Sequence, residues 1–90
     1  MVEIYMWGLD VVTYNHESKK WEVWNNTCSG ELSSTVVKRK DIAKNIVNVT
    51  KRFRCYRETM EDAKTFIAEY RDAWKSFDRN RVMKILRSCK

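Results

Sequence analysis

The sequence contains no proline and only two glycines, Gly8 and Gly30, among its 90 residues. Because linkers between domains are usually rich in glycine, serine or proline, we expect residues 1–90 to form a single domain. No apolar run approaches the roughly 20 residues that a membrane-spanning helix needs. The first ten residues include Glu3 and Asp10 but no basic residue, unlike a secretory signal peptide. We therefore predict a cytoplasmic protein without a membrane partner.

Residues that catalyse reactions or bind metals are also scarce. His16 is the only histidine, and it lies beside Glu17 in a polar segment that predicts a solvent-exposed turn. One such histidine does not make a Ser-His-Asp or Cys-His set, and two distant glycines cannot form a phosphate-binding loop. We predict that the protein is not an enzyme and that it has no metal or cofactor.

The three cysteines, Cys28, Cys55 and Cys89, include no pair with the spacing of metal ligands. Their number is odd, and thiols in the cytoplasm are kept reduced. We therefore expect free thiols, with Cys55 and Cys89 packed as small apolar side chains.

The first part of the chain has the composition of β-strands. Residues 2–14 are rich in β-branched and aromatic side chains and predict one long strand, in which Gly8 would mark a bulge or the close approach of another backbone. The polar residues 15–19 predict a hairpin turn, and the alternation in 20–24 predicts the returning strand. A loop at 25–31 and a third strand at 32–38 follow.

Residues 41–56 fit two structures. Apolar residues recur at helical spacing from Ile42 to Phe53, whereas β-branched and aromatic side chains, with a two-residue alternation from residue 52 onward, favour a strand. We favour a turn or one helical turn near 40–45, followed by a fourth strand at about 47–57. The helical alternative remains open.

The last third of the chain predicts two helices. Thr59 begins a sequence that resembles a capping box, and apolar residues recur at steps of three and four from Met60 to Phe77. This pattern predicts a helix at 59–76 whose apolar stripe packs on the sheet. Asp78 is the predicted N-cap of a second, shorter helix that ends near Cys89.

Strands followed by helices predict an α+β fold. We expect an antiparallel β-sheet of three to four strands, followed by two C-terminal helices packed on one of its faces. The other face of the sheet would then be open to solvent or to a partner.

The net charge of +6 is unevenly distributed. Residues 38–57 include eight basic residues and one acidic residue, Asp41, a net charge of +7. On a strand at 47–57, Arg52, Arg54 and Tyr56 would share the open face at a spacing of about 7 Å. Guanidinium groups bind phosphates and a phenol ring can stack on a base. We predict a regulatory nucleic-acid-binding protein that prefers RNA to DNA.

The predicted interface is basic apart from one tyrosine. Its members are Lys38, Arg39, Lys40, Lys44, Lys51, Arg52, Arg54, Tyr56 and Arg57. Residues 38–40 belong to it if the third and fourth strands pair. The last helix offers four candidate additional contacts, namely Arg79, Arg81, Lys84 and Arg87.

The alternative function is a protein-binding inhibitor or adaptor that recognises an acidic or RNA-bound protein. If exposed, Trp7 or Trp24 would anchor such an interface, since tryptophan and arginine dominate binding hot spots. The short length, the lack of proline and the aromatic first strand are similar in style to small accessory proteins of large lytic bacteriophages. That likeness implies a protein that blocks a host enzyme, toxin or defence factor in the host cytoplasm. It covers no defined motif and assigns no residue.

Overall fold

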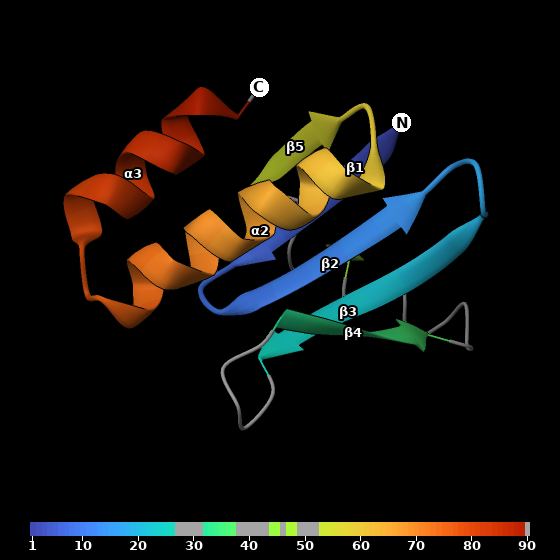
Figure 1. The fold of residues 1–90 in the computed structure, drawn as a ribbon, viewed down its shortest axis with the longest axis horizontal. Helices are drawn as coiled ribbons and strands as arrows, with labels where there is room; N and C mark the ends of the chain where they lie inside the picture. Colours follow the sequence, from blue (N-terminus) through green and yellow to red (C-terminus); the bar gives the residue numbers. More distant parts are fainter. Residues whose placement is uncertain (27–31, 38–43, 46, 49–52, 90) are drawn as a thin grey trace.

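The computed structural model describes residues 1–26, 32–37, 44–45, 47–48 and 53–89. Its strands form one antiparallel sheet in the order β4-β3-β2-β1-β5, and α2 and α3 cover one face of that sheet (Figure 1). The predicted α+β fold is confirmed. The elements are β1 (Val2–Trp7), β2 (Asp10–Asn15), β3 (Lys20–Asn26), β4 (Leu32–Val37), β5 (Arg54–Arg57), α2 (Met60–Lys75) and α3 (Arg79–Ser88).

The segment predicted as one long strand is a hairpin. Trp7 at the end of β1 pairs with Asp10 at the start of β2, so the chain reverses through Gly8 and Leu9 alone. Gly8 has a φ of 55°, in the left-handed region that a residue without Cβ enters at little cost. The glycine therefore marks a tight turn and not a bulge. This turn is one reason why the sheet formed by the described residues has five strands and not three to four.

The next two predicted strands are confirmed. Asn15 pairs with Lys20 across the turn at 16–19, and its Oδ1 accepts a hydrogen bond of 2.9 Å from the backbone N–H of Glu17. In β3, Trp24 is buried on the helix side, where its Nε1 donates to Thr13 Oγ1 at 2.8 Å. Trp24 is therefore a core residue and not an interface anchor.

The prediction of a fourth strand at 47–57 is wrong for most of its described length. Residues 44–45 and 47–48 are helical, and the strand β5 begins only at Arg54. β5 pairs with β1, at the opposite edge of the sheet from β4, so β4 and β5 do not pair, and their pairing was the condition for residues 38–40 to join the predicted interface. Among the described residues, no helix is long and apolar enough to cross a membrane.

Both predicted helix starts are confirmed. The Thr59 hydroxyl accepts from the backbone N–H of Asp62 at 3.1 Å, and the Asp78 carboxylate accepts from that of Arg81 at 3.0 Å. Each bond satisfies one backbone donor that would otherwise lack a partner in the first turn of the helix.

The core lies between the sheet and the two helices. Ile4 and Met6 of β1 pack with Ile67 and Tyr70 of α2 and with Val82 of α3, and all five side chains are buried. This arrangement confirms most of the predicted apolar stripe of the first helix.

Phe77 is the exception on that stripe, because its side chain is 90% exposed. α2 ends before Phe77, which has a left-handed φ of 52° and no longer follows the helical direction. The prediction that Phe77 packs on the sheet is therefore wrong.

Arg71 of α2 is a buried cation that hydrogen-bonds to the backbone of the sheet. Only 7% of its surface is exposed, and its Nη1 donates to the backbone oxygens of Leu9 and Trp24, the latter at 3.0 Å. Burial lowers the pKa of Arg71, and the negative charge of Asp10 opposes that shift. Arg71 thus links α2 to the backbone of the β1–β2 turn and of β3.

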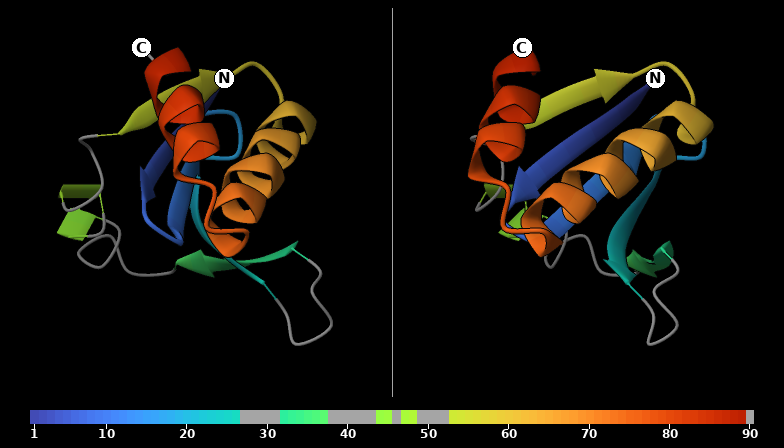
Figure 2. Two further views of the ribbon diagram at one scale, coloured as in Figure 1. Left: turned by 90° about the vertical axis from the view of Figure 1, so that its left-hand side faces the viewer. Right: turned by 60° about the vertical axis from the view of Figure 1, so that its left-hand side comes forward.

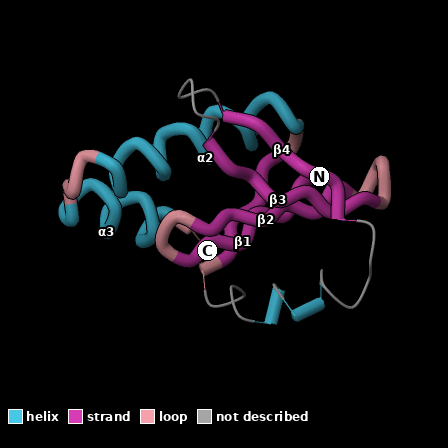
Figure 3. Tube along the Cα trace, turned by 90° about the horizontal axis from the view of Figure 1, so that it is seen from below, coloured by secondary structure: helices cyan, strands magenta, loops and turns pink. Residues whose placement is uncertain are grey.

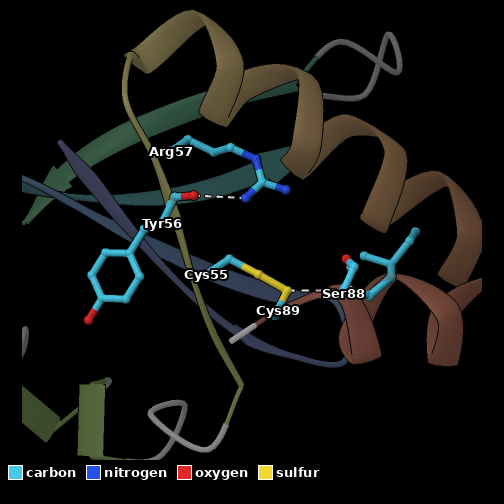
Figure 4. Close-up of a disulfide and its surroundings, with 6 residues drawn as sticks. Cys55, Tyr56, Arg57, Ser88 and Cys89 are labelled. Carbon is cyan, nitrogen blue, oxygen red and sulfur yellow. Dashed lines mark hydrogen bonds between the residues drawn. A yellow bond between two sulfur atoms is a disulfide. The ribbon is translucent and has the colours of Figure 1, made fainter.

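Cys55 of β5 and Cys89 after α3 form a disulfide, which corrects the expectation of free thiols (Figure 4). Cys55 points to the core, and α3 packs so that Cys89 reaches it, with the two Cα atoms 5.0 Å apart. The pairing depends on tertiary packing, because the two cysteines are 34 positions apart in the sequence. Cys28 lies outside the described residues.

Candidate nucleic-acid interface

The sheet face opposite α2 and α3 carries a row of side chains from four strands. Trp21 of β3 pairs with Tyr14 of β2, Tyr14 with Glu3 of β1, and Glu3 with Tyr56 of β5. Alternation along the strands gives these paired residues one common side of the sheet. We call this surface the aromatic face and define it as Glu3, Tyr5, Tyr14, His16, Trp21, Arg54 and Tyr56.

The aromatic rings of this face touch one another across three strands. The ring centroids of Tyr14 and Trp21 are 4.6 Å apart, and those of Tyr5 and Trp21 are 5.9 Å apart. His16 meets Tyr14 edge-on at 4.7 Å. Tyr5 is only 5% exposed, whereas Tyr14 and Trp21 are half-buried. Tyr5 therefore forms the floor of the face, and the two outer rings remain accessible.

Arg54 and Tyr56 form the basic end of the aromatic face. The guanidinium carbon of exposed Arg54 lies 5.2 Å from the centroid of the half-buried Tyr56 ring. Tyr56 points away from α2 and α3 (Figure 4). Arg54 also hydrogen-bonds the Tyr5 side chain. A cation–π contact uses the π surface and not the N–H groups, so the other guanidinium donors can still bind phosphate.

Glu3 is the acid at the centre of the face. Tyr5 Oη donates to its Oε2 at 2.6 Å, and His16 Nε2 lies 3.2 Å from its Oε1. Burial alone would raise the pKa of Glu3, but these hydrogen bonds and the charges of His16 and Arg54 outweigh it and lower the pKa. Burial, together with Glu3, raises the pKa of Tyr5 to about 12. Glu3 therefore stays ionised, and its negative charge lies beside His16 and Arg54.

The face is less open than the sequence predicts. Val12 pairs with Tyr5 on the same side of the sheet and is 1% exposed, although both helices pack on the other side. The helical turns at 44–45 and 47–48 lie on the side away from α2 (Figures 2 and 3). Lys44, in the first of these turns, is exposed. The accessible part of the face is thus limited to its outer members.

Arg57 lies on the opposite side of β5 from Arg54 and Tyr56. Its guanidinium carbon is 4.4 Å from the ring centroid of Phe66 in α2, and its Nη1 donates to the backbone oxygen of Tyr56 at 2.7 Å. Figure 4 shows the side chain directed toward α2. Arg57 therefore does not belong to the predicted patch, because neighbouring strand residues point to opposite faces.

The four candidate residues of α3 lie in the helix layer, on the far side of the sheet from the aromatic face (Figure 2). Arg81 forms an ion pair of 2.8 Å with Asp72, while Arg79, Lys84 and Arg87 are exposed. They form a second basic surface and do not extend the first. The remaining predicted contacts, Lys38, Arg39, Lys40, Lys51 and Arg52, lie outside the described residues.

Sequence reasoning identified Arg54 and Tyr56 but missed Tyr5, Tyr14 and Trp21 as their neighbours. The alternation in 20–24 separates Trp21 from Trp24 but does not say which of the two faces the core, and the structure places Trp24 there. Recognition of the turn at Gly8 would have aligned Tyr5 and Tyr14 as well. Within the described ranges, no cluster of three residues could hold a metal ion.

Comparison of the chain with known protein families, curated proteins and solved structures gave no match.

Proposed function

We propose that the protein binds single-stranded nucleic acid on the aromatic face, with RNA preferred to DNA, and that it acts by binding and not by catalysis. The observation that carries this proposal is the contact of Arg54 with Tyr56 in the same sheet face as the Tyr14 and Trp21 rings. Aromatic side chains beside a cation are what an unstacked base and its phosphate need.

The shape of the face favours single strands over duplexes. Half-buried rings on a sheet can stack on splayed bases, whereas bases within a duplex are already stacked on each other. The hydroxyl groups of Tyr14 and Tyr56 can exchange hydrogen bonds with a ribose 2′-OH, which DNA lacks. The charge of +7 over residues 38–57 adds attraction for phosphates.

Fluorescence anisotropy with labelled single-stranded RNA, across a salt series, tests the proposal. Arg54→Ala should weaken binding about tenfold and reduce the salt slope by about 0.7, the value for one phosphate contact on a single strand. Tyr56→Leu keeps an apolar side chain but removes the ring, and should cost about 1–3 kcal/mol of binding energy. Lys64→Ala is the matched control, because Lys64 is an exposed cation of α2.

Equal affinities for wild type, Arg54→Ala and Tyr56→Leu would rule out the aromatic face as the binding surface. Equal losses for Arg54→Ala and Lys64→Ala would show that only net charge matters. Single-stranded DNA of the same base sequence measures the preference for RNA.

We also propose that the protein acts in the cytoplasm, which would be the host cytoplasm for a viral protein. The Cys55–Cys89 disulfide weighs against this location, because disulfides persist mainly in oxidising compartments. Alkylation of thiols in intact cells before extraction, followed by mass spectrometry, decides whether the disulfide forms where the protein acts.

A further inference from the structure

An apolar groove lies between the β1–β2 turn and the corner where α2 leads into α3. Its cavity volume is about 660 Å³, and its lining includes Trp7, Phe53, Trp74, Phe77, Met83 and Leu86. Three of these large apolar side chains are exposed, Phe77 by 90%, Trp7 by 56% and Met83 by 46%. Large apolar side chains gathered at a hollow are typical of interaction sites.

The backbone at Phe77 is unfavourable for a phenylalanine. The N–H of Phe77 donates to the Trp74 oxygen at 3.2 Å, and that of Asp78 donates to the Ala73 oxygen at 3.1 Å. These two bonds define a helix-ending motif whose left-handed position is usually glycine. A bulky residue there is a rare outlier, and such outliers concentrate at functional sites. The strained turn holds the ring at the mouth of the groove, where it gains almost no burial in the free protein.

The charge around the groove indicates an acidic occupant. α3 contains four basic residues, Arg79, Arg81, Lys84 and Arg87, and no acidic residue. Arg81 is balanced by Asp72, but exposed Arg79 itself lines the groove. The carboxylate of Asp78 is occupied as the cap of α3. A second copy of this chain, with its net charge of +6, is a poor fit for such a rim.

We propose that this groove binds an acidic amphipathic helix of a partner protein. Apolar side chains of the partner, spaced at i, i+3 or i+4 and i+7, would fill the hollow between Trp7, Phe77 and Met83. Carboxylates along one edge of that helix would pair with Arg79. Tryptophan and arginine at the centre of a desolvated contact are the residues that most often dominate binding energy. This surface is separate from the aromatic face and does not depend on its function.

Selection from a displayed library of helical peptides with randomised surface positions tests the proposal without a known partner. We expect the enriched peptides to be acidic, to carry apolar residues at helical spacing and to bind in the micromolar range. Phe77→Gly and Arg79→Gln should each weaken the selected peptides at least about tenfold. Leu9→Ala and Lys64→Gln are the matched controls, because both residues are exposed but do not line the groove. These controls should change the affinity less than about twofold.

Several outcomes would overturn the proposal. Selection of neutral or basic peptides would exclude an acidic helical occupant. The same conclusion would follow if every selected peptide bound wild type and Phe77→Gly equally well. Sedimentation showing a dimer that Phe77→Gly abolishes would assign the groove to a second copy. Arg54→Ala should not affect the peptides and Phe77→Gly should not affect RNA binding, so each proposal can fail while the other stands.

Discussion

Replacing Phe77 by glycine should stabilise the protein, although the change deletes a whole aromatic ring. The ring is 90% exposed, so little apolar burial is lost. A left-handed conformation costs an L-residue about 1–2 kcal/mol, and glycine avoids that cost. Glycine also makes the unfolded chain more flexible, and this reduces the gain in stability by about 0.5–1 kcal/mol. The expected net gain in the free energy of unfolding is about 0.5–1 kcal/mol.

Urea unfolding followed by tryptophan fluorescence measures this gain, and thermal melting followed by circular dichroism should show a Tm higher by about 2–8 °C. Phe77→Ala is the decisive comparison, because alanine also removes the ring but keeps the Cβ and therefore the unfavourable backbone. It should stay close to wild type, with glycine clearly above it. Equal stabilities for Phe77→Gly and Phe77→Ala would show that the left-handed backbone carries no cost and would refute the reasoning. A loss above about 1 kcal/mol in both variants would also refute it, since the ring would then contribute packing.

Two further predictions concern the disulfide and pH. Reduction of Cys55–Cys89, or its replacement by two alanines, should lower the free energy of unfolding by about 4 kcal/mol, the chain-entropy value for a closed loop of this 34-residue separation. Urea midpoints with and without reductant measure the loss, and identical midpoints would contradict it. The lowered pKa of Glu3 means that its contribution to stability is present above its ordinary pKa of 4.5 and is lost as the pH falls through the lowered value. Unfolding between pH 3 and 7 should therefore depend less on pH in Glu3→Gln, and an unchanged dependence would exclude a favourable role for the ionised carboxylate.

The parts of the fold that depend on local chemistry could be predicted from the sequence. The caps at Thr59 and Asp78 work through hydrogen bonds within three residues, so the residue types alone identify them. Phe77 shows the limit of that approach. Helical spacing includes it in the apolar stripe, but only the backbone after Ser76 shows that the helix has already ended.

Features that depend on strand order could not be predicted. The alternation at 54–57 correctly separates Cys55 from Arg54 and Tyr56, because side-chain direction along a strand is a local property. Which strand lies beside β5 is not local. β5 pairs with β1 and not with β4, and this pairing brings Arg54 near Tyr5.

The missed hairpin and the crowded aromatic face have one physical cause. Strands buried on a single face alternate between apolar and polar residues, but β1 and β2 have buried side chains on both faces, among them Ile4 and Met6 on one side and Tyr5 and Val12 on the other. Residues 2–14 therefore show an almost continuous apolar pattern in which neither the faces nor the turn at Gly8 stands out. The same burial keeps the Tyr5 ring beneath the outer rings of the aromatic face, where a base cannot reach it. Any base that stacks on this face must do so on the outer rings, and substitutions there should affect binding more than stability.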